Sequence, residues 1–114
     1  MLFKERHVGP IERGEKTVTR RLWKRWHVRV GGIYPIQTRL FGPGSEPRGW
    51  VRVTDGGLER LGDITEASAL AEGGYTTEEF RRVWTEINGA WDPTRVVHVV
   101  EFEYVGRERP DGNP

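Results

Sequence analysis

The sequence of 114 residues contains no cysteine, so a disulfide-stabilised scaffold and a thiolate metal site are both excluded. Its only histidines are His7, His27 and His98, and their spacing fits no metal-binding motif. No apolar run approaches the length that crosses a membrane, and charges stand where a signal peptide needs its apolar region. We therefore expect a cytoplasmic protein without a metal or another cofactor.

The chain is short of hydrophobic residues, which make up 35% of it, while charged residues make up 31%. A chain of this length forms one domain with one modest core, in which the aromatic residues, five Trp among them, carry much of the packing. Residues 106–114 are Gly, Pro and charged residues with little else. We expect residues 1–105 to fold as the domain and residues 106–114 to form a disordered tail.

The net charge is only +1, yet the charges are spread unevenly along the chain. Residues 1–57 carry twelve Lys or Arg against five Asp or Glu, whereas residues 58–114 carry six against twelve. A basic half that stayed separate in the fold would attract a polyanion such as RNA. In the alternative, the two halves neutralise each other across the fold. The sequence favours neither outcome.

The segment from Gly14 to Arg21 combines a chain reversal with an amine, hydroxyl groups and two guanidinium groups. Before it, Pro10–Arg13 suits a short helical turn that Gly14 ends. After it, Thr17–Thr19 favours a strand, because β-branched side chains fit extended backbone. We expect this strand to lie at a sheet edge, where a ligand reaches both side chains and backbone, with Lys16 at the corner.

Apolar periodicity predicts the main elements of the second half. The capping box at Thr76–Glu79 opens a helix whose apolar residues form one stripe that packs on the sheet. Residues 96–105 form the strongest strand, which we expect to be central and paired with the strand after Gly14. His98 lies on the apolar face of this strand and is expected to be a hydrogen-bonded core residue. The stripe of the helix consists of Phe80, Val83, Trp84 and Ile87.

Turn chemistry divides the middle of the chain. Thr54–Gly57 is typical of a tight turn, because its glycines accept positive φ. Pro35 belongs on an edge strand, since proline cannot donate to a β-ladder. A capping box at Asp63–Glu66 predicts a short helix that Gly73 and Gly74 end. The remaining expected elements are strands over residues 2–4, 33–40 and 50–53 and a flexible loop over residues 41–49.

Basic and aromatic residues alternate between Arg20 and Arg29. Cations that follow phosphates, beside rings that stack on bases, are typical of nucleic-acid binding. In the alternative, one helical turn buries Leu22 and Trp26 and leaves the cations as a solvated face. We expect at least one Trp of the segment to be buried. The candidate ligand-binding residues are Thr17, Arg20, Arg21, Trp23, Lys24, Arg25, Trp26 and Arg29.

The order and spacing of several short segments resemble the ASCH domain over about residues 2–104. This resemblance implies an α+β fold, a small PUA-like β-barrel of five or six strands with two to three short helices, in a class of folds that holds RNA or modified bases. The segments are Gly14–Arg21, Val30–Tyr34, Trp50–Val53, Leu61–Thr65, Glu72–Tyr75 and Val99–Phe102.

Some small ASCH proteins are amidohydrolases that remove the acetyl group from N4-acetylcytidine. The resemblance implies that Lys16, Thr19 and Glu72 are the catalytic residues if this chain is one of them, because Lys16 and Thr19 match the family's Gly-x-Lys-Thr-x-Thr run. In a regular strand, however, residues three apart face opposite sides, so Lys16 and Thr19 converge only at an irregular corner.

Three functions remain open on the sequence. The first in rank is binding of RNA or a modified nucleoside in a basic cleft beside Gly14–Arg21. The second is hydrolysis of N4-acetylcytidine, and the third is a protein-interaction module that uses the acidic half. The sequence does not indicate an oligomeric state.

Overall fold

The structure, a computed structural model, describes residues 1–110. The predicted tail begins at Gly106, which ends the last strand, and residues 111–114 of that tail lie outside the described residues. No helix in residues 1–110 has the length and apolar character to span a bilayer. The elements are α1 (Glu5–Glu12), β1 (Val18–Arg21), β2 (Ile33–Ile36), β3 (Gly49–Arg60), a 3-10 turn η1 (Leu61–Asp63), α2 (Glu66–Gly73), α3 (Thr77–Asn88) and β4 (Val96–Gly106).

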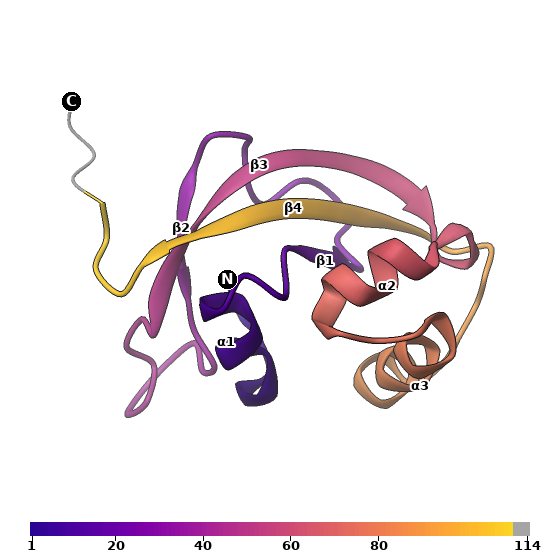
Figure 1. Cartoon of the computed structure of the whole chain (residues 1–114), viewed down its shortest axis with the longest axis horizontal. Coiled ribbons are helices and arrows are strands. Elements are labelled where there is room, and N and C mark those ends of the chain that lie inside the picture. Colours follow the sequence, from indigo (N-terminus) through magenta and orange to yellow (C-terminus); the bar gives the residue numbers. More distant parts are fainter. Residues whose placement is uncertain (111–114) are drawn as a thin grey trace.

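The four strands form one antiparallel sheet in the order β1-β4-β3-β2. In Figure 1 the long strands β3 and β4 arch over the helices, so that the sheet is a curled half-barrel. The prediction that β4 is central and pairs with β1 is confirmed, with Val18 opposite Glu101. The α+β class is confirmed, as is the placement of Pro35 on the edge strand β2.

The predicted number of five or six strands is wrong for the described residues. The expected first strand, residues 2–4, makes only one isolated bridge, between Leu2 and Gln37, because α1 begins at Glu5 and leaves no length for a ladder. The strand expected over residues 33–40 ends at Ile36. The sheet therefore curls without closing, and β1 and β2 are its free edges.

The turn predicted at Thr54–Gly57 is also wrong, because these residues lie inside β3. A register shift between Val53 and Asp55 adds one residue to β3 relative to β4, which is a β-bulge rather than a chain reversal. Gly56 lies against the ring of Trp26, and a Cβ on it would be 2.8 Å from the nearest ring atom. The glycine is required here for a close approach and not for a turn.

The chain reversal at Gly14 is confirmed, since Gly14 has a φ of 74°. The helix before it is longer than predicted: α1 begins at Glu5, so Pro10 lies in its last turn and not at its start. Beyond Gly14, the backbone N–H groups of Glu15 and Lys16 both donate to the carbonyl of Pro10. This double hydrogen bond fixes the corner at which Lys16 enters the fold.

The helices α2 and α3 begin at threonine caps. The predicted capping box of Thr76 and Glu79 is confirmed, whereas α2 is capped by Thr65 and not by Asp63. In the predicted stripe of α3, Phe80 and Trp84 are buried, but Ile87 at the end of the helix is 43% exposed.

The buried apolar residues form two separate clusters under the curled sheet. One gathers around α1, and the other packs α2 and α3 against the opposite half of β4. Figure 1 shows α1 on one side of the concave face and the α2–α3 pair on the other. The first cluster consists of Phe3, Val8, Ile11, Ile36, Val51 and Phe102, and the second of Leu61, Ala69, Phe80, Trp84 and Val97.

Two polar contacts join the two helical parts. Nε2 of His7 on α1 lies 2.8 Å from the hydroxyl of Tyr75, which stands between α2 and α3. Arg6 and Glu86 form an exposed ion pair at 3.5 Å. Burial, together with the positive charge of Lys16 and Arg6, lowers the pKa of His7 to about 4, so His7 is neutral at physiological pH.

We expect the free energy of unfolding to decrease as the pH falls from 6.5 towards 4. The unfolded chain protonates His7 near pH 6.5, whereas the folded chain takes up this proton only near pH 4, so acid favours the unfolded state. The difference between the pKa values of His7 in the unfolded and folded chain limits this decrease to about 3 kcal/mol. Denaturant unfolding at pH 7 and pH 5 measures it. His7→Gln retains a partner for Tyr75 but does not titrate, and an equal decrease in that variant would contradict the assignment.

Candidate functional site

A cavity of about 700 Å³ lies between the two core clusters, beside the free edge of β1. Its apolar walls come from both clusters, with Phe3 on one side and Phe80 and Trp84 on the other. Ligand cavities in proteins typically have 300–1,000 Å³ and mostly apolar walls with a few polar groups. The polar groups of this cavity come from β1, from the end of α2 and from the segments around α1 and after β2.

Lys16 enters the cavity wall from the corner after Gly14 and is only 2% exposed. Its Nζ donates to the carbonyls of Val18 at 3.0 Å and Glu72 at 2.6 Å, and lies 3.3 Å from Oε1 of Glu72. Burial lowers the pKa of Lys16, and the adjacent Glu72 opposes this shift. The neutral amine of Lys16 is therefore reached at a lower pH than that of an exposed lysine.

Glu72 lies in the last turn of α2, where Gly74 in the left-handed conformation ends the helix. Backbone carbonyls of the last turn have no partner within a helix, so the carbonyl of Glu72 is free to accept from Lys16. Its carboxylate also accepts from Arg20 at 3.0 Å. The side chains of Lys16, Arg20 and Glu72 are each at most 5% exposed. The buried carboxylate thus holds two cations.

Thr19 and Arg21 lie on the opposite face of β1 from Arg20. Thr19 is opposite Val100 in the ladder, while Arg20 is opposite Val99. The Thr19 hydroxyl accepts a hydrogen bond from Nε of Arg21 at 3.0 Å. Since Lys16 bonds to other oxygens, no base among residues 1–110 is hydrogen-bonded to Thr19. Both Lys16 and Thr19 line the cavity, because it lies at the strand edge.

The sequence-derived candidates separate into two groups in the fold. Thr17 belongs to neither group, since it does not line the cavity. Its backbone holds the start of β1 in place: its N–H donates to the carbonyl of Ala71 and its carbonyl accepts from the N–H of Phe102. The cavity group consists of Lys16, Thr19, Arg20, Arg21 and Glu72, and the outer group consists of Trp23, Lys24, Arg25, Trp26 and Arg29, none of which lines the cavity.

The outer group lies on an irregular segment between β1 and β2, without the helical turn considered from the sequence. Trp23 is half-buried, whereas Trp26 is 43% exposed. Both rings pack against His98, with centroids 5.8 Å and 4.6 Å away. His98 is buried as predicted, but its Nδ1 has no hydrogen-bond partner among the described residues, so that part of the prediction is wrong.

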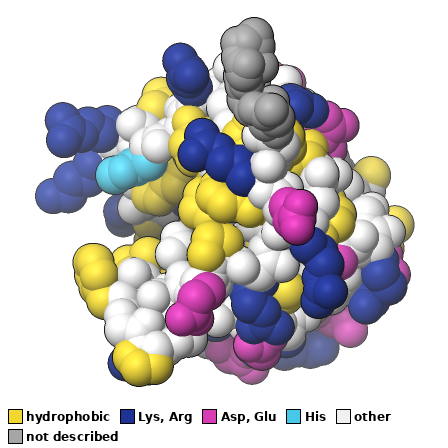
Figure 2. Space-filling view, turned by 90° about the vertical axis from the view of Figure 1, so that its left-hand side faces the viewer, with side chains coloured by type: hydrophobic (Ala, Val, Ile, Leu, Met, Phe, Trp, Pro, Cys, Tyr) yellow, Lys and Arg dark blue, Asp and Glu magenta, His cyan; other side chains and the backbone are white. Residues whose placement is uncertain are grey.

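The basic and acidic halves of the sequence meet in the fold. Arg6–Glu86, Lys16–Glu72 and Arg52–Glu103 are ion pairs between them. On the face drawn in Figure 2, acidic and basic side chains intermix over the lower part, and basic side chains stand alone at one upper edge. Lys24, Arg25 and Arg29 of the outer group are exposed, and none is in an ion pair with another described residue. The charges of the basic half and the acidic half of the sequence thus neutralise each other in part.

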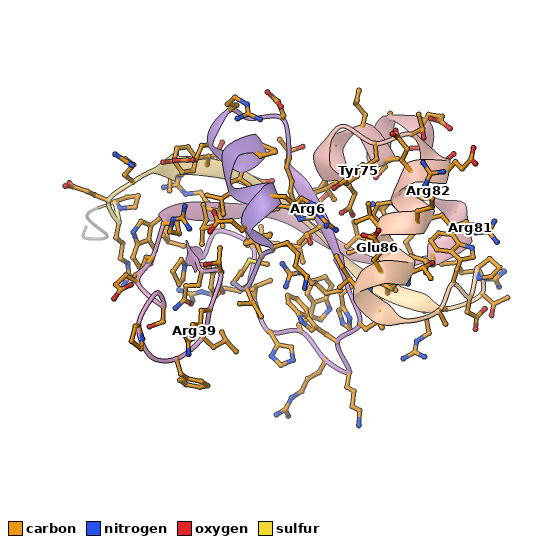
Figure 3. All side chains as sticks on the ribbon, turned by 90° about the horizontal axis from the view of Figure 1, so that it is seen from below. Arg6, Arg39, Tyr75, Arg81, Arg82 and Glu86 are labelled. Atoms are coloured by element: carbon orange, nitrogen blue, oxygen red, sulfur yellow. The ribbon has the colours of Figure 1, made fainter. Side chains whose placement is uncertain are left out.

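The cavity residues that were not singled out as site residues from the sequence include His7, Tyr75 and Arg39. Tyr75 stands in the Glu72–Tyr75 segment of the ASCH resemblance, and that position is a signal that points to it. His7 and Arg39 carry no such signal, because only the fold brings α1 and the loop after β2 to the cavity. Figure 3 shows Arg6 and Glu86 reaching towards one another between α1 and α3, with Tyr75 close by.

Residues 1–110 contain no group of three or more His, Asp or Glu side chains that could hold a metal ion. Neither a protein-family model nor a curated protein sequence matches the chain. Crystal structures of two bacterial proteins are similar to it. Protein EF3133 from Enterococcus faecalis V583, described under the family model DUF984, has 22% identity and a TM-score of 0.67, and the match covers 90% of this chain and 72% of that one.

The second is the ASCH domain from Lactobacillus crispatus JV V101, with 16% identity and a TM-score of 0.62. That match covers 87% of this chain and 70% of the other. At these identities the likeness concerns the fold alone. By that likeness and by its curled antiparallel sheet with three α-helices, the chain has the PUA-like fold of an ASCH domain.

Proposed function

We propose that the chain binds a nucleoside in the cavity between its two core clusters. The observation that carries this proposal is a cavity of about 700 Å³ in which apolar walls surround a small set of buried polar groups. Aromatic side chains such as Phe80 contribute to the apolar wall against which a base would pack, and Thr19 and Tyr75 offer hydroxyl groups. Because Thr19 accepts from Arg21, its own O–H is free to donate to a carbonyl of the ligand.

Removal of the Thr19 hydroxyl tests nucleoside binding. Thr19→Val keeps the shape of the side chain but loses one hydrogen bond, so we expect N4-acetylcytidine to bind roughly three- to tenfold more weakly. Titration calorimetry measures this loss. Thr17→Val, two positions away on a side chain outside the cavity lining, is the matched control and should bind as the wild type does. Equal affinities in all three proteins would argue against this site.

A second function, hydrolysis of the acetyl amide of N4-acetylcytidine, is favoured by the contact between Lys16 and Glu72. In this proposal, a water oxygen forms a bond to the acyl carbon while the neutral amine of Lys16 accepts the proton. The Thr19 hydroxyl donates to the oxyanion that forms. The C–N bond then breaks, Lys16 returns the proton to the leaving amine, and the products are acetate and cytidine. Glu72 holds the Lys16 amine in place throughout.

Water is a better nucleophile than Thr19 in this arrangement. A threonine that attacks needs a base in hydrogen-bond contact, and the partner of its oxygen is the donor Nε of Arg21. Lys16 and Glu72, in contrast, are in contact with each other and face the same cavity. In our proposal, Thr19 therefore acts as a hydrogen-bond donor and not as the nucleophile.

The rate of this hydrolysis should rise with pH. The base is the neutral amine, which becomes more populated as the pH approaches the pKa of Lys16, and burial lowers that pKa, so the rise should level off below pH 10.5. Lys16→Met keeps the length of the side chain without a base and should reduce turnover by about 100-fold or more. Chromatographic detection of cytidine measures the rate, with Thr17→Val as control. Wild-type turnover in Lys16→Met would exclude Lys16 as the base.

The exposed outer group supports an extension of binding to RNA. Lys24 and Arg25 form no ion pair with residues 1–110 and lie near the exposed Trp26 in the sequence, as phosphate contacts and a stacking surface require. We expect affinity for mixed RNA to fall steeply with salt, and to fall further in the double variant Lys24→Glu, Arg25→Glu. Filter binding at two salt concentrations measures both effects. The double variant Arg81→Glu, Arg82→Glu on α3 makes the same charge change, and an equal loss there would mean non-specific attraction only.

A further inference from the structure

Arg21 is a cation of the cavity wall that has no carboxylate partner among the described residues. Lys16 is paired with Glu72, and Arg20 is paired with both Glu72 and Glu59. Arg21 has no such partner among residues 1–110: its Nε donates to Thr19, and its guanidinium group lies 4.8 Å from the ring centroid of Phe3. The terminal nitrogens of Arg21 therefore remain available on a partly buried side chain that lines the cavity.

Other ionised groups of the cavity wall add to this excess of unpaired positive charge. Lys4 and Arg39 also line the cavity, and neither is in an ion pair within the described residues. Arg39 uses one nitrogen on the carbonyl of Pro43. Among the described residues, the wall has one carboxylate besides that of Glu72, and it belongs to Glu5, which is paired with Arg48 at 2.8 Å. The acidic groups are thus engaged, while Arg21, Lys4 and Arg39 are not.

A partly buried cation without a counter-charge is unfavourable, and a ligand anion removes the cost. A phosphate suits this position, because the planar fork of a guanidinium group donates two parallel hydrogen bonds to it. Lys4 and Arg39 supply the additional positive charge that a doubly charged phosphomonoester favours. A neutral nucleoside would fill the apolar part of the cavity and leave Arg21 unpaired.

We propose that the part of the cavity formed by Arg21, Lys4 and Arg39 is a phosphate subsite, and that the preferred ligand is a nucleoside monophosphate. This inference rests on the proposed nucleoside binding and specifies its substrate class. The phosphomonoester lies against Arg21, while the base occupies the end of the cavity formed by Lys16 and Glu72. Arg20 and Arg21, although adjacent in sequence, thus have different tasks.

The test compares the affinities of cytidine 5′-monophosphate and cytidine by titration calorimetry, and its readout is the ratio of the two dissociation constants. In the wild type we expect the monophosphate to bind about tenfold or more tightly, as a charge-assisted bidentate contact would give. Arg21→Gln should reduce this ratio to about twofold or less, whereas Arg21→Lys, which keeps the charge, should retain most of it. Arg82→Gln, on the exposed face of α3, should leave the ratio unchanged.

If Arg21→Gln does not fold, as a thermal melt would show, Arg39→Gln on the exposed loop replaces it, with an expected reduction of the ratio of about threefold. Equal affinities of the two ligands in the wild type would overturn the subsite and leave nucleoside binding intact. Absence of binding for both ligands would overturn the proposed function as well. If the ratio of dissociation constants is unchanged in Arg21→Gln, the assignment to Arg21 is wrong. If an oligoribonucleotide binds more tightly than cytidine and the monophosphate does not, the ligand is an RNA strand and not a monophosphate.

Discussion

The buried contact of Glu72 with Lys16 and Arg20 is the interaction on which the rest of this structure depends. Removing three ionised groups from water costs several kcal/mol for each ion, and only their mutual contacts offset this cost. Loss of the carboxylate would leave buried Lys16 without a counter-charge and Arg20 with Glu59 alone, and breaking a buried ion pair in this way costs about 3–5 kcal/mol in proteins. In a chain with 35% hydrophobic residues, such a cluster adds little net stability. What the cluster does set is geometry, because it ties the corner after Gly14 and the strand β1 to the end of α2.

The local backbone is arranged so that this contact forms. Gly14 reverses the chain after α1, and the double hydrogen bond to Pro10 sets the corner from which Lys16 points inward. On the other side, Gly74 ends α2 so that the carbonyl of Glu72 is left for the lysine. A cation at this position also suits the negative end of the helix dipole. Two glycines thus define a site whose polar groups come from segments more than fifty residues apart.

The elements that the sequence predicted well are those set by local chemistry. The reversal at Gly14, the capping box of α3 and the central strand β4 depend on residue type and periodicity, and each is confirmed. The errors arise where a distant contact overrides local preference: Gly56 looks like a turn residue, but it serves the close approach of Trp26. The ASCH resemblance named Lys16 and Glu72 as candidate residues, but their contact with each other is a finding of the structure. Local pattern cannot supply it, because no periodicity relates residues on separate elements.

The adjacent arginines of β1 show how a short strand can give one residue type two tasks. Side chains alternate along a strand, so Arg20 turns towards α2 and the carboxylates of Glu59 and Glu72, while Arg21 turns towards Thr19 and Phe3. A shift of the register by one residue would exchange these surroundings. The ladder with β4, which places Arg20 opposite Val99 and Arg21 opposite His98, excludes that exchange. The charge balance of the cavity is therefore set by strand pairing: Arg20 is neutralised by carboxylates inside the protein, whereas Arg21 has no carboxylate partner among the described residues.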